Sequence, residues 1–206
     1  MLQWLKGWAG YALDICALAS GRFKNPRSLM KFFIVARLGR ATGATIFIET
    51  GTYRGVMASR ASRFFKKVYT IELDHKLAQS AKQRFSRRRN IEVIEGDAVR
   101  ELEGLLSAPQ MSDALLFLDA HYSGGPTAKG EIPEPAIEEL KSAARHSDKI
   151  TAIAIDDFRS FGVEPGFPSK DELLDAIRHL LGPKGFEARV HRDLVLIERT
   201  QKDHHR

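Results

Sequence analysis

From Ala44 onward, short apolar runs rich in β-branched residues alternate with segments whose apolar residues recur at helical spacing. The runs predict five strands: Thr45–Glu49, Val68–Leu73, Ile91–Ile94, Ala114–Leu118 and Ile150–Ile155. Strands that alternate with helices indicate an α/β fold with a doubly wound, Rossmann-like parallel sheet. Two further runs, Phe186–Val190 and Leu194–Glu198, flank a short turn, which predicts an antiparallel hairpin at the end of the sheet.

Two helical patterns, Met1–Ser20 and Ser28–Arg40, precede the sheet. Met1–Ser20 vaguely resembles a signal peptide, but Asp14 interrupts its apolar run, and the run is too short to span a bilayer. We therefore expect no transmembrane segment. The chain is divided into an N-terminal helical extension (1–42), a sheet domain (43–200) and a polar tail (201–206). The extension would serve as a lid or as the surface of a homodimer.

Composition restricts the setting in which the chain works. The 206 residues include one cysteine, Cys16, so no disulfide can form within the chain, and we expect a reducing, cytoplasmic location. The net charge is +6, with ten Lys or Arg and two acids between Arg60 and Arg89. Such a basic face could attract nucleic acid, an anionic membrane or a phosphorylated substrate. A solvated helix face is the simpler interpretation, because no aromatic residues interleave for base stacking.

The first strand runs into a loop of the form E-x-G-x-x-x-G, from Glu49 to Gly55. A dinucleotide fingerprint would need glycine where Tyr53 and Val56 stand, and a phosphate-binding P-loop would need lysine after Gly55. An acid at the strand tip instead suits a ligand that carries a positive charge. An ordinary β–α turn is the alternative.

Acidic residues end or directly follow all five strands: Glu49, Glu72, Asp97, Asp119 and Asp156, the last followed by Asp157. Ligands of open α/β sheets bind at the carboxyl ends of the strands. Buried acids need partners, so five in succession indicate a site, although each alone could cap a helix.

The glycine loop, the strand-tip acids and the closing hairpin together resemble the class I S-adenosylmethionine-dependent methyltransferases, over about three quarters of the chain. The resemblance implies that residues 43–200 form a methyltransferase domain. It implies that Glu72 binds the ribose of S-adenosylmethionine, that Asp97 and Ala98 meet its adenine, and that Glu49 lies near its methionine end. The full set implied for the cofactor is Glu49, Thr50, Gly51, Thr52, Tyr53, Gly55, Glu72, Asp97, Ala98 and Asp119.

Asp119 and the pair Asp156-Asp157 resemble the metal site of metal-dependent O-methyltransferases of the catechol and macrocin types. Neighbouring strands lie about 4.8 Å apart, so these acids can converge, and three oxygen donors suit Mg²⁺ or another divalent cation. Such a cation would lower the pKa of a substrate hydroxyl. His121 is the candidate general base beside Asp119, with hydrogen bonding inside its loop as the alternative role.

The sequence therefore predicts O-methylation of a small-molecule hydroxyl, assisted by a divalent cation. Two alternatives stay open: a nucleic-acid methyltransferase that uses the basic 60–89 face, and an inactive cofactor-binding protein. The identity of the substrate does not follow from the sequence.

Overall fold

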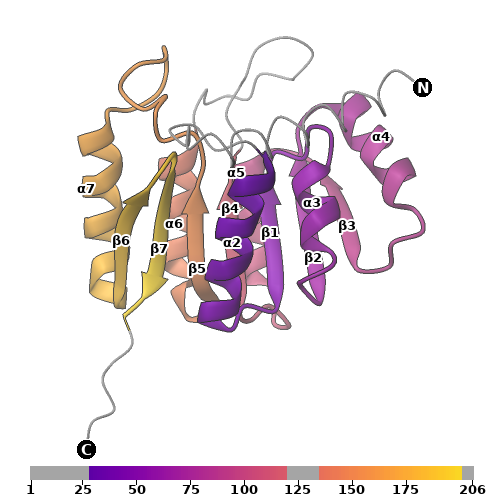
Figure 1. Cartoon of the computed structure of the whole chain (residues 1–206), viewed down its shortest axis with the longest axis horizontal. Coiled ribbons are helices and arrows are strands. Elements are labelled where there is room, and N and C mark those ends of the chain that lie inside the picture. The colour runs from indigo at the N-terminus through magenta and orange to yellow at the C-terminus, as the bar shows by residue number, and fades with distance from the viewer. Residues whose placement is uncertain (1–27, 120–134, 201–206) are drawn as a thin grey trace, which may run out of the picture.

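The computed structural model describes residues 28–119 and 135–200, which form one seven-stranded sheet between two layers of helices (Figure 1). The strand order is β3-β2-β1-β4-β5-β7-β6. The first five strands pair in parallel, and β7 is antiparallel to both of its neighbours. Their bounds are β1 Ile46–Thr50, β2 Lys67–Glu72, β3 Ile91–Glu95, β4 Ala114–Leu118, β5 Ile150–Ile155, β6 Phe186–His191 and β7 Leu194–Arg199.

The predicted strands and the closing antiparallel hairpin are confirmed, and every predicted end lies within one residue of the observed end. The predicted helix Met1–Ser20 and the tail 201–206 lie outside the described residues. Within the described ranges, no helix combines the length and the apolar character needed to cross a membrane.

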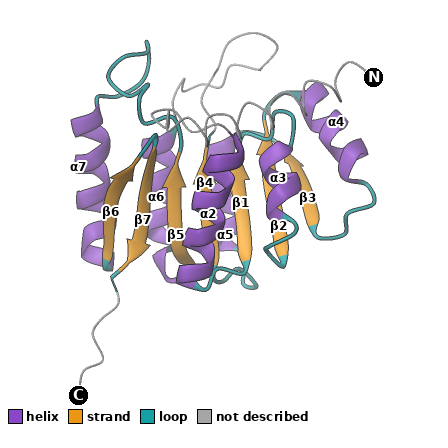
Figure 2. Cartoon of the chain, viewed as in Figure 1, coloured by secondary structure: helices purple, strands orange, loops and turns teal. Residues whose placement is uncertain are grey.

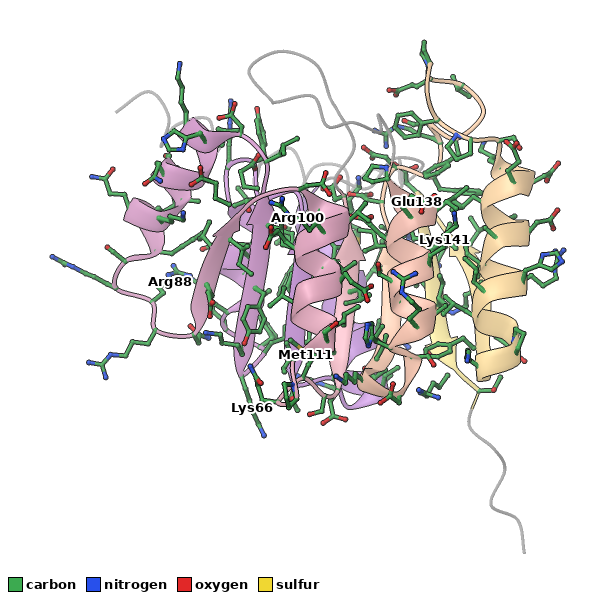
Figure 3. All side chains as sticks on the ribbon, turned by 180° about the vertical axis from the view of Figure 1, so that it is seen from behind. Lys66, Arg88, Arg100, Met111, Glu138 and Lys141 are labelled. Atoms are coloured by element: carbon green, nitrogen blue, oxygen red, sulfur yellow. The ribbon has the colours of Figure 1, made fainter. Side chains whose placement is uncertain are left out.

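Helices cover both faces of the sheet (Figure 2). Helices α2, α3 and α4 contribute to a core with Phe47, Leu115 and Phe117 on one face, and α5, α6 and α7 pack on the other. Figure 3 shows the second layer from behind, with Arg100 on α5 and Glu138 on α6. The bounds are α2 Ser28–Thr42, α3 Val56–Ala61, α4 His75–Phe85, α5 Ala98–Ser107, α6 Ala136–Arg145 and α7 Lys170–Leu181, with 3₁₀ turns η1 Ser147–Lys149 and η2 Gly182–Lys184.

Helix α2 is part of one of the two helical layers, because it packs directly on the sheet. Phe32, Val35 and Leu38 are buried against the strands. The apolar spacing of the sequence predicts a buried stripe of Leu29, Phe32, Phe33 and Ala36. Phe33 is 54% exposed, so the buried face is rotated from the expected one. The described part of the predicted extension thus contributes to the core, and a lid or dimer role for residues 1–27 stays a prediction.

Helix α7 begins at a capping box, which the sequence Ser169-Lys170-Asp171-Glu172 predicts. Ser169 Oγ accepts a hydrogen bond from the Glu172 backbone N–H at 3.1 Å, and the Glu172 carboxylate accepts one from the Ser169 N–H at 2.7 Å. This reciprocal pair satisfies two N–H groups that have no partner inside the helix. The start of the helix is therefore fixed locally, by two residues that lie three positions apart in the sequence.

Several cations of the basic segment Arg60–Arg89 are fixed by contacts within the fold. Arg88 donates to the Ser59 carbonyl at 2.9 Å, and Lys67 pairs with Glu92 at 2.8 Å (Arg88 is labelled in Figure 3). Lys82 pairs with Glu95 at 3.0 Å. Lys82 thus joins α4 to β3, Lys67 joins β2 to β3, and Arg88 bonds to α3. These contacts engage positive charge that would otherwise be available to a polyanion.

Adjacent phenylalanines in α2 test whether this helix belongs to the core. Phe32 is 3% exposed and Phe33 is 54% exposed. We expect Phe32→Ala to lower the free energy of unfolding by about 3–5 kcal/mol, because it leaves a cavity against the sheet. Phe33→Ala, the matched control, should cost less than about 1 kcal/mol. Urea denaturation measures both, and equal losses would contradict the assignment of α2 to the core.

Candidate functional site

The register of the parallel strands brings their carboxyl ends to one edge of the sheet. Thr50 pairs with Ile71 of β2 and with Leu118 of β4, and Leu118 pairs with Ile155 of β5. The acids at or just after these positions therefore lie side by side. They are Glu49, Glu72, Asp119, Asp156 and Asp157.

The loop after β1 needs its glycines. Gly51 has φ 90°, Tyr53 φ 46° and Gly55 φ 64°, so three of its residues are left-handed. The Gly55 N–H donates to the Thr52 carbonyl at 2.7 Å, and a Cβ on Gly55 would lie 2.7 Å from the Phe85 ring. The chain thus turns sharply from β1 into α3, in a conformation that lets a ligand approach the backbone closely.

Glu49 is buried at the tip of β1 within a small hydroxyl network. Thr70 Oγ1 donates to Glu49 Oε2 at 2.7 Å, and Thr52 and Thr70 share a hydrogen bond of 2.6 Å. Burial raises the pKa of Glu49 to about 8; the bond from Thr70 opposes this shift, and the charge of Glu72 adds to it. The carboxyl group is therefore protonated at neutral pH until a positive charge comes beside it.

Glu72 holds the glycine loop in place. Its carboxylate accepts the N–H of Tyr53 at 2.7 Å and the N–H of Asp74 at 3.0 Å. Asp97 caps α5, accepting the N–H groups of Val99 and Arg100 at 3.1 Å each; Ala98 is the first residue of that helix. The alternative role stated for Asp97 is thus observed, and the ribose and adenine contacts stay predictions.

A second cluster lies after β5, where Asp156, Asp157 and Asp193 place carboxylate oxygens within 4.8 Å of one another. Lys31 of α2 reaches into it: its Nζ lies 2.5 Å from Asp156 Oδ1 and 2.8 Å from Asp157 Oδ1. Arg159 approaches from the other side, 3.0 Å from Asp157 and in contact with Asp193. Two cations therefore already contact this cluster, which includes two of the three acids expected to hold a metal, Asp156 and Asp157.

Asp119 begins the segment after β4. Its N–H donates to the Thr50 carbonyl at 3.2 Å and to Thr50 Oγ1 at 3.1 Å. Burial and the nearby charges of Asp156 and Asp157 raise the pKa of Asp119 well above its usual range. Asp119 is therefore an electrostatic neighbour of the pair, and metal binding by Asp119 stays a prediction. Asp193 completes the closest acidic trio among the described residues. His121 lies outside these residues.

Lys31 and its acidic partners shift one another's pKa. Burial raises the pKa of Asp156, and Lys31 partly offsets this. For Lys31, burial lowers the pKa, but the two aspartates outweigh it, and the net shift is upward. The ammonium group is thus fixed in its charged form.

Three residues of this cluster were missed from the sequence: Lys31, Arg159 and Asp193. Lys31 lies four residues before Val35 and seven before Leu38, so a charged side chain stands on the buried face of α2. The position of Lys31 on this face could have predicted an acidic partner, because a lone buried charge requires one. Arg159 and Asp193 carried no comparable signal, because both stand in loops.

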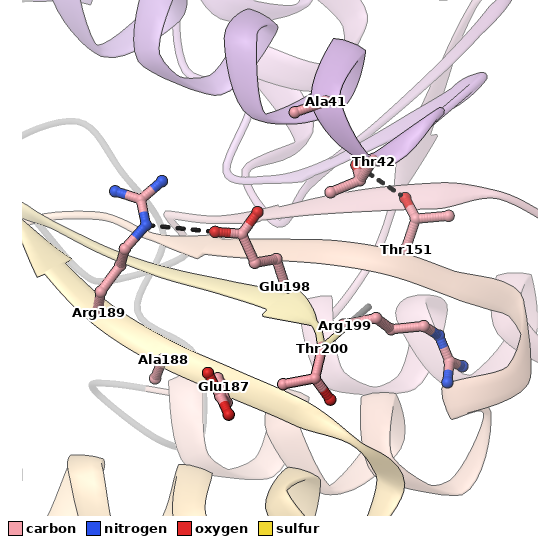
Figure 4. A pocket seen from close by; sticks show the side chains of 9 residues that line it. All are labelled: Ala41, Thr42, Thr151, Glu187, Ala188, Arg189, Glu198, Arg199 and Thr200. Atoms are coloured by element: carbon pink, nitrogen blue, oxygen red, sulfur yellow. Dashed lines mark hydrogen bonds and ion pairs between the residues drawn. The ribbon is translucent and has the colours of Figure 1, made fainter. Parts of the chain in front are cut away.

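A hollow of about 610 Å³ lies away from these strand tips, at the C-terminal end of α2 (Figure 4). Its walls include Thr42, Thr151 and the ion pair between Arg189 and Glu198 at 3.3 Å. It is formed by the beginning of β5, by β6 and by the end of β7. It is therefore separate from the predicted site.

No protein-family model matches the chain. Over 142 residues the chain is 34% identical to protein-L-isoaspartate O-methyltransferase 2 of Nitrosococcus oceani, a match that takes in 66% of this chain and 57% of that protein. The chain thus spans a little over half the length of the curated relative it matches.

Two solved structures show the same fold. The O-methyltransferase of Bacillus cereus in complex with SAH aligns with a TM-score of 0.60 and 16% identity, over 93% of this chain and 91% of that one. The O-methyltransferase TomG of Streptomyces achromogenes in complex with SAM aligns with a TM-score of 0.53 and 20% identity, over 83% and 80%. The chain therefore has the Rossmann-like methyltransferase fold, and the fold that the resemblance implied is confirmed.

The raised pKa of Glu49 makes a prediction about stability. Its folded-state pKa of about 8 lies above that of the unfolded chain, so the folded state loses stability relative to the unfolded state as pH rises from about 4.5 to 8. Glu49→Gln removes this loss, and we expect the variant to gain on the parent protein as pH rises. Urea denaturation at pH 5, 6.5 and 8 measures the difference. The exposed Glu92→Gln is the control, and a parallel pH profile for Glu49→Gln and the parent would contradict the assignment.

Proposed function

We propose that this chain is an S-adenosylmethionine-dependent methyltransferase that methylates a hydroxyl group of a small molecule. The observation that carries the proposal is the buried Glu49 beside the left-handed glycine loop, at the carboxyl edge of a methyltransferase sheet. S-adenosylmethionine carries an amino group and a sulfonium, and either charge would favour ionised Glu49. In this proposal, the rest of the cofactor lies along Tyr53, Glu72, Asp97 and Ala98.

The proposed reaction moves one methyl group. The substrate oxygen attacks the methyl carbon, the electrons of the carbon–sulfur bond pass to sulfur, and neutral S-adenosylhomocysteine leaves. The hydroxyl proton passes to a base and then to water. We propose His121 as that base, with Asp119 beside it, because histidine exchanges protons near neutral pH.

The predicted divalent cation does not fit the residues as they are arranged. Asp119, Asp156 and Asp157 are suitable oxygen donors, but the Lys31 ammonium occupies the space between Asp156 and Asp157. A metal ion on the same oxygens would have to displace a cation held by two carboxylates. The reaction above therefore uses no metal ion.

The sequence relative suggests a second acceptor, because it is named for protein L-isoaspartate. The carboxylates of Asp156, Asp157 and Asp193 outnumber the two cations that contact them, Lys31 and Arg159. This excess of negative charge near the proposed reaction centre favours a neutral hydroxyl over a carboxylate. A small hydroxylated molecule is therefore the preferred class of substrate. We also propose a homodimer that forms through the N-terminal helical extension, and a cytoplasmic location, as the sequence predicts.

Calorimetric titration with S-adenosylmethionine and with NAD tests the proposal. We expect the parent to bind S-adenosylmethionine and not NAD, and Gly51→Val to abolish binding, because Gly51 has φ 90° at the ligand loop. Gly43→Val is the matched control: Gly43 also has positive φ (71°) but precedes β1 at the opposite edge. Equal binding by the parent and Gly51→Val would remove the assigned site, and NAD binding alone would overturn the function.

Specific nucleic-acid binding by the basic segment is not expected, because several of its cations are paired within the fold. Fluorescence titration with several RNA and DNA sequences at two salt concentrations measures this. Weak, sequence-independent binding that fades with salt is the expected result. A sequence-dependent, submicromolar affinity at physiological salt would favour a nucleic-acid methyltransferase instead.

A further inference from the structure

Lys31 differs from an ordinary surface lysine in its setting. Its side chain is 12% exposed, and those of Asp156 and Asp157 are 5% and 14% exposed. Exposed ion pairs add little to stability, whereas buried carboxylates without a counter-charge are strongly unfavourable. The cluster of three acids therefore depends on a cation, and α2 supplies one.

The ammonium group stands where the sequence placed a metal ion. It lies 2.5 Å from Asp156 Oδ1 and 2.8 Å from Asp157 Oδ1. The third acid of the cluster, Asp193, has its Oδ2 4.0 Å from the same nitrogen, beyond hydrogen-bond length. Mg²⁺ would need these oxygens at about 2.0–2.1 Å. An ammonium and a divalent ion cannot share them, because their charges repel across so short a distance.

We infer that the Lys31 ammonium is the resident cation of this site and keeps divalent metal ions off Asp156 and Asp157. In the proposed reaction, Lys31 then supplies positive charge at the strand tips, where a metal ion was expected to act. It stays protonated throughout, and the proton of the hydroxyl goes to the base. That consequence rests on the proposed function, whereas the exclusion of metal does not.

Titration with Mn²⁺, followed by the electron paramagnetic resonance of the free ion, tests the inference. The parent protein should show no site tighter than about 1 mM. Lys31→Met, which keeps most of the length of the side chain and removes its charge, should bind Mn²⁺ at least about tenfold more tightly, since it removes the cation that lies between Asp156 and Asp157. Lys141→Met is the matched control. Lys141 is also a helical lysine in an ion pair, but it pairs only with Glu138 and its side chain is exposed. Mn²⁺ binding by the parent as tight as by Lys31→Met would overturn the inference.

A second measurement covers the case in which Lys31→Met does not fold without metal. The melting temperature of the parent should be the same in Mn²⁺ and in chelator, and a rise of several degrees in Mn²⁺ would overturn the inference. Calorimetry with S-adenosylmethionine on the same samples separates the two proposals. A parent that binds neither ligand would refute the proposed function and leave the exclusion of metal intact. A parent that binds both Mn²⁺ and S-adenosylmethionine would support the proposed function and overturn the exclusion of metal.

Discussion

Parallel pairing of β1, β2, β4 and β5 ends all four strands at one edge of the sheet, and the acids of that edge cannot avoid one another. Because helices cover both faces, these carboxylates also lose much of their hydration. Each must find a proton, a hydrogen-bond donor or a cation. The contacts around this edge supply the proton, the hydrogen-bond donors and the cations that these carboxylates need.

The chain solves it in three ways, and each has a chemical consequence. Glu49 relies on threonine hydroxyls and a proton, so it is neutral until a cationic ligand arrives. Glu72 relies on two backbone N–H groups, which fix the glycine loop. Asp156 and Asp157 rely on Lys31. The edge thus combines a group that can become charged beside a cationic ligand with a region whose negative charge is already partly offset by cations.

The strands were predictable because each is a short apolar run between turn residues, and periodicity reports such runs locally. The strand-tip acids followed from the strand ends. The partner of Asp157 did not, because Lys31 lies 126 residues away and belongs to a helix that precedes the sheet. The rotation of α2 was also missed, since Phe32 and Phe33 are equally apolar and only packing distinguishes them. Local sequence patterns predict the strands and helices. Which cation pairs with which acid depends on contacts between residues far apart in the sequence, and these patterns do not report such contacts.

Packing and electrostatics meet in α2. Val35 and Leu38 hold the helix against the sheet, and one turn before them the same face carries Lys31. A lysine side chain has a flexible four-carbon stem, so its ammonium is held in place only if its backbone is fixed. The hydrophobic contacts of α2 provide that fixed backbone, and the aspartates restrain the charged end. If α2 left the sheet, Asp156 and Asp157 would lose their nearest cation, so the packing of α2 and the charge balance of this cluster depend on each other.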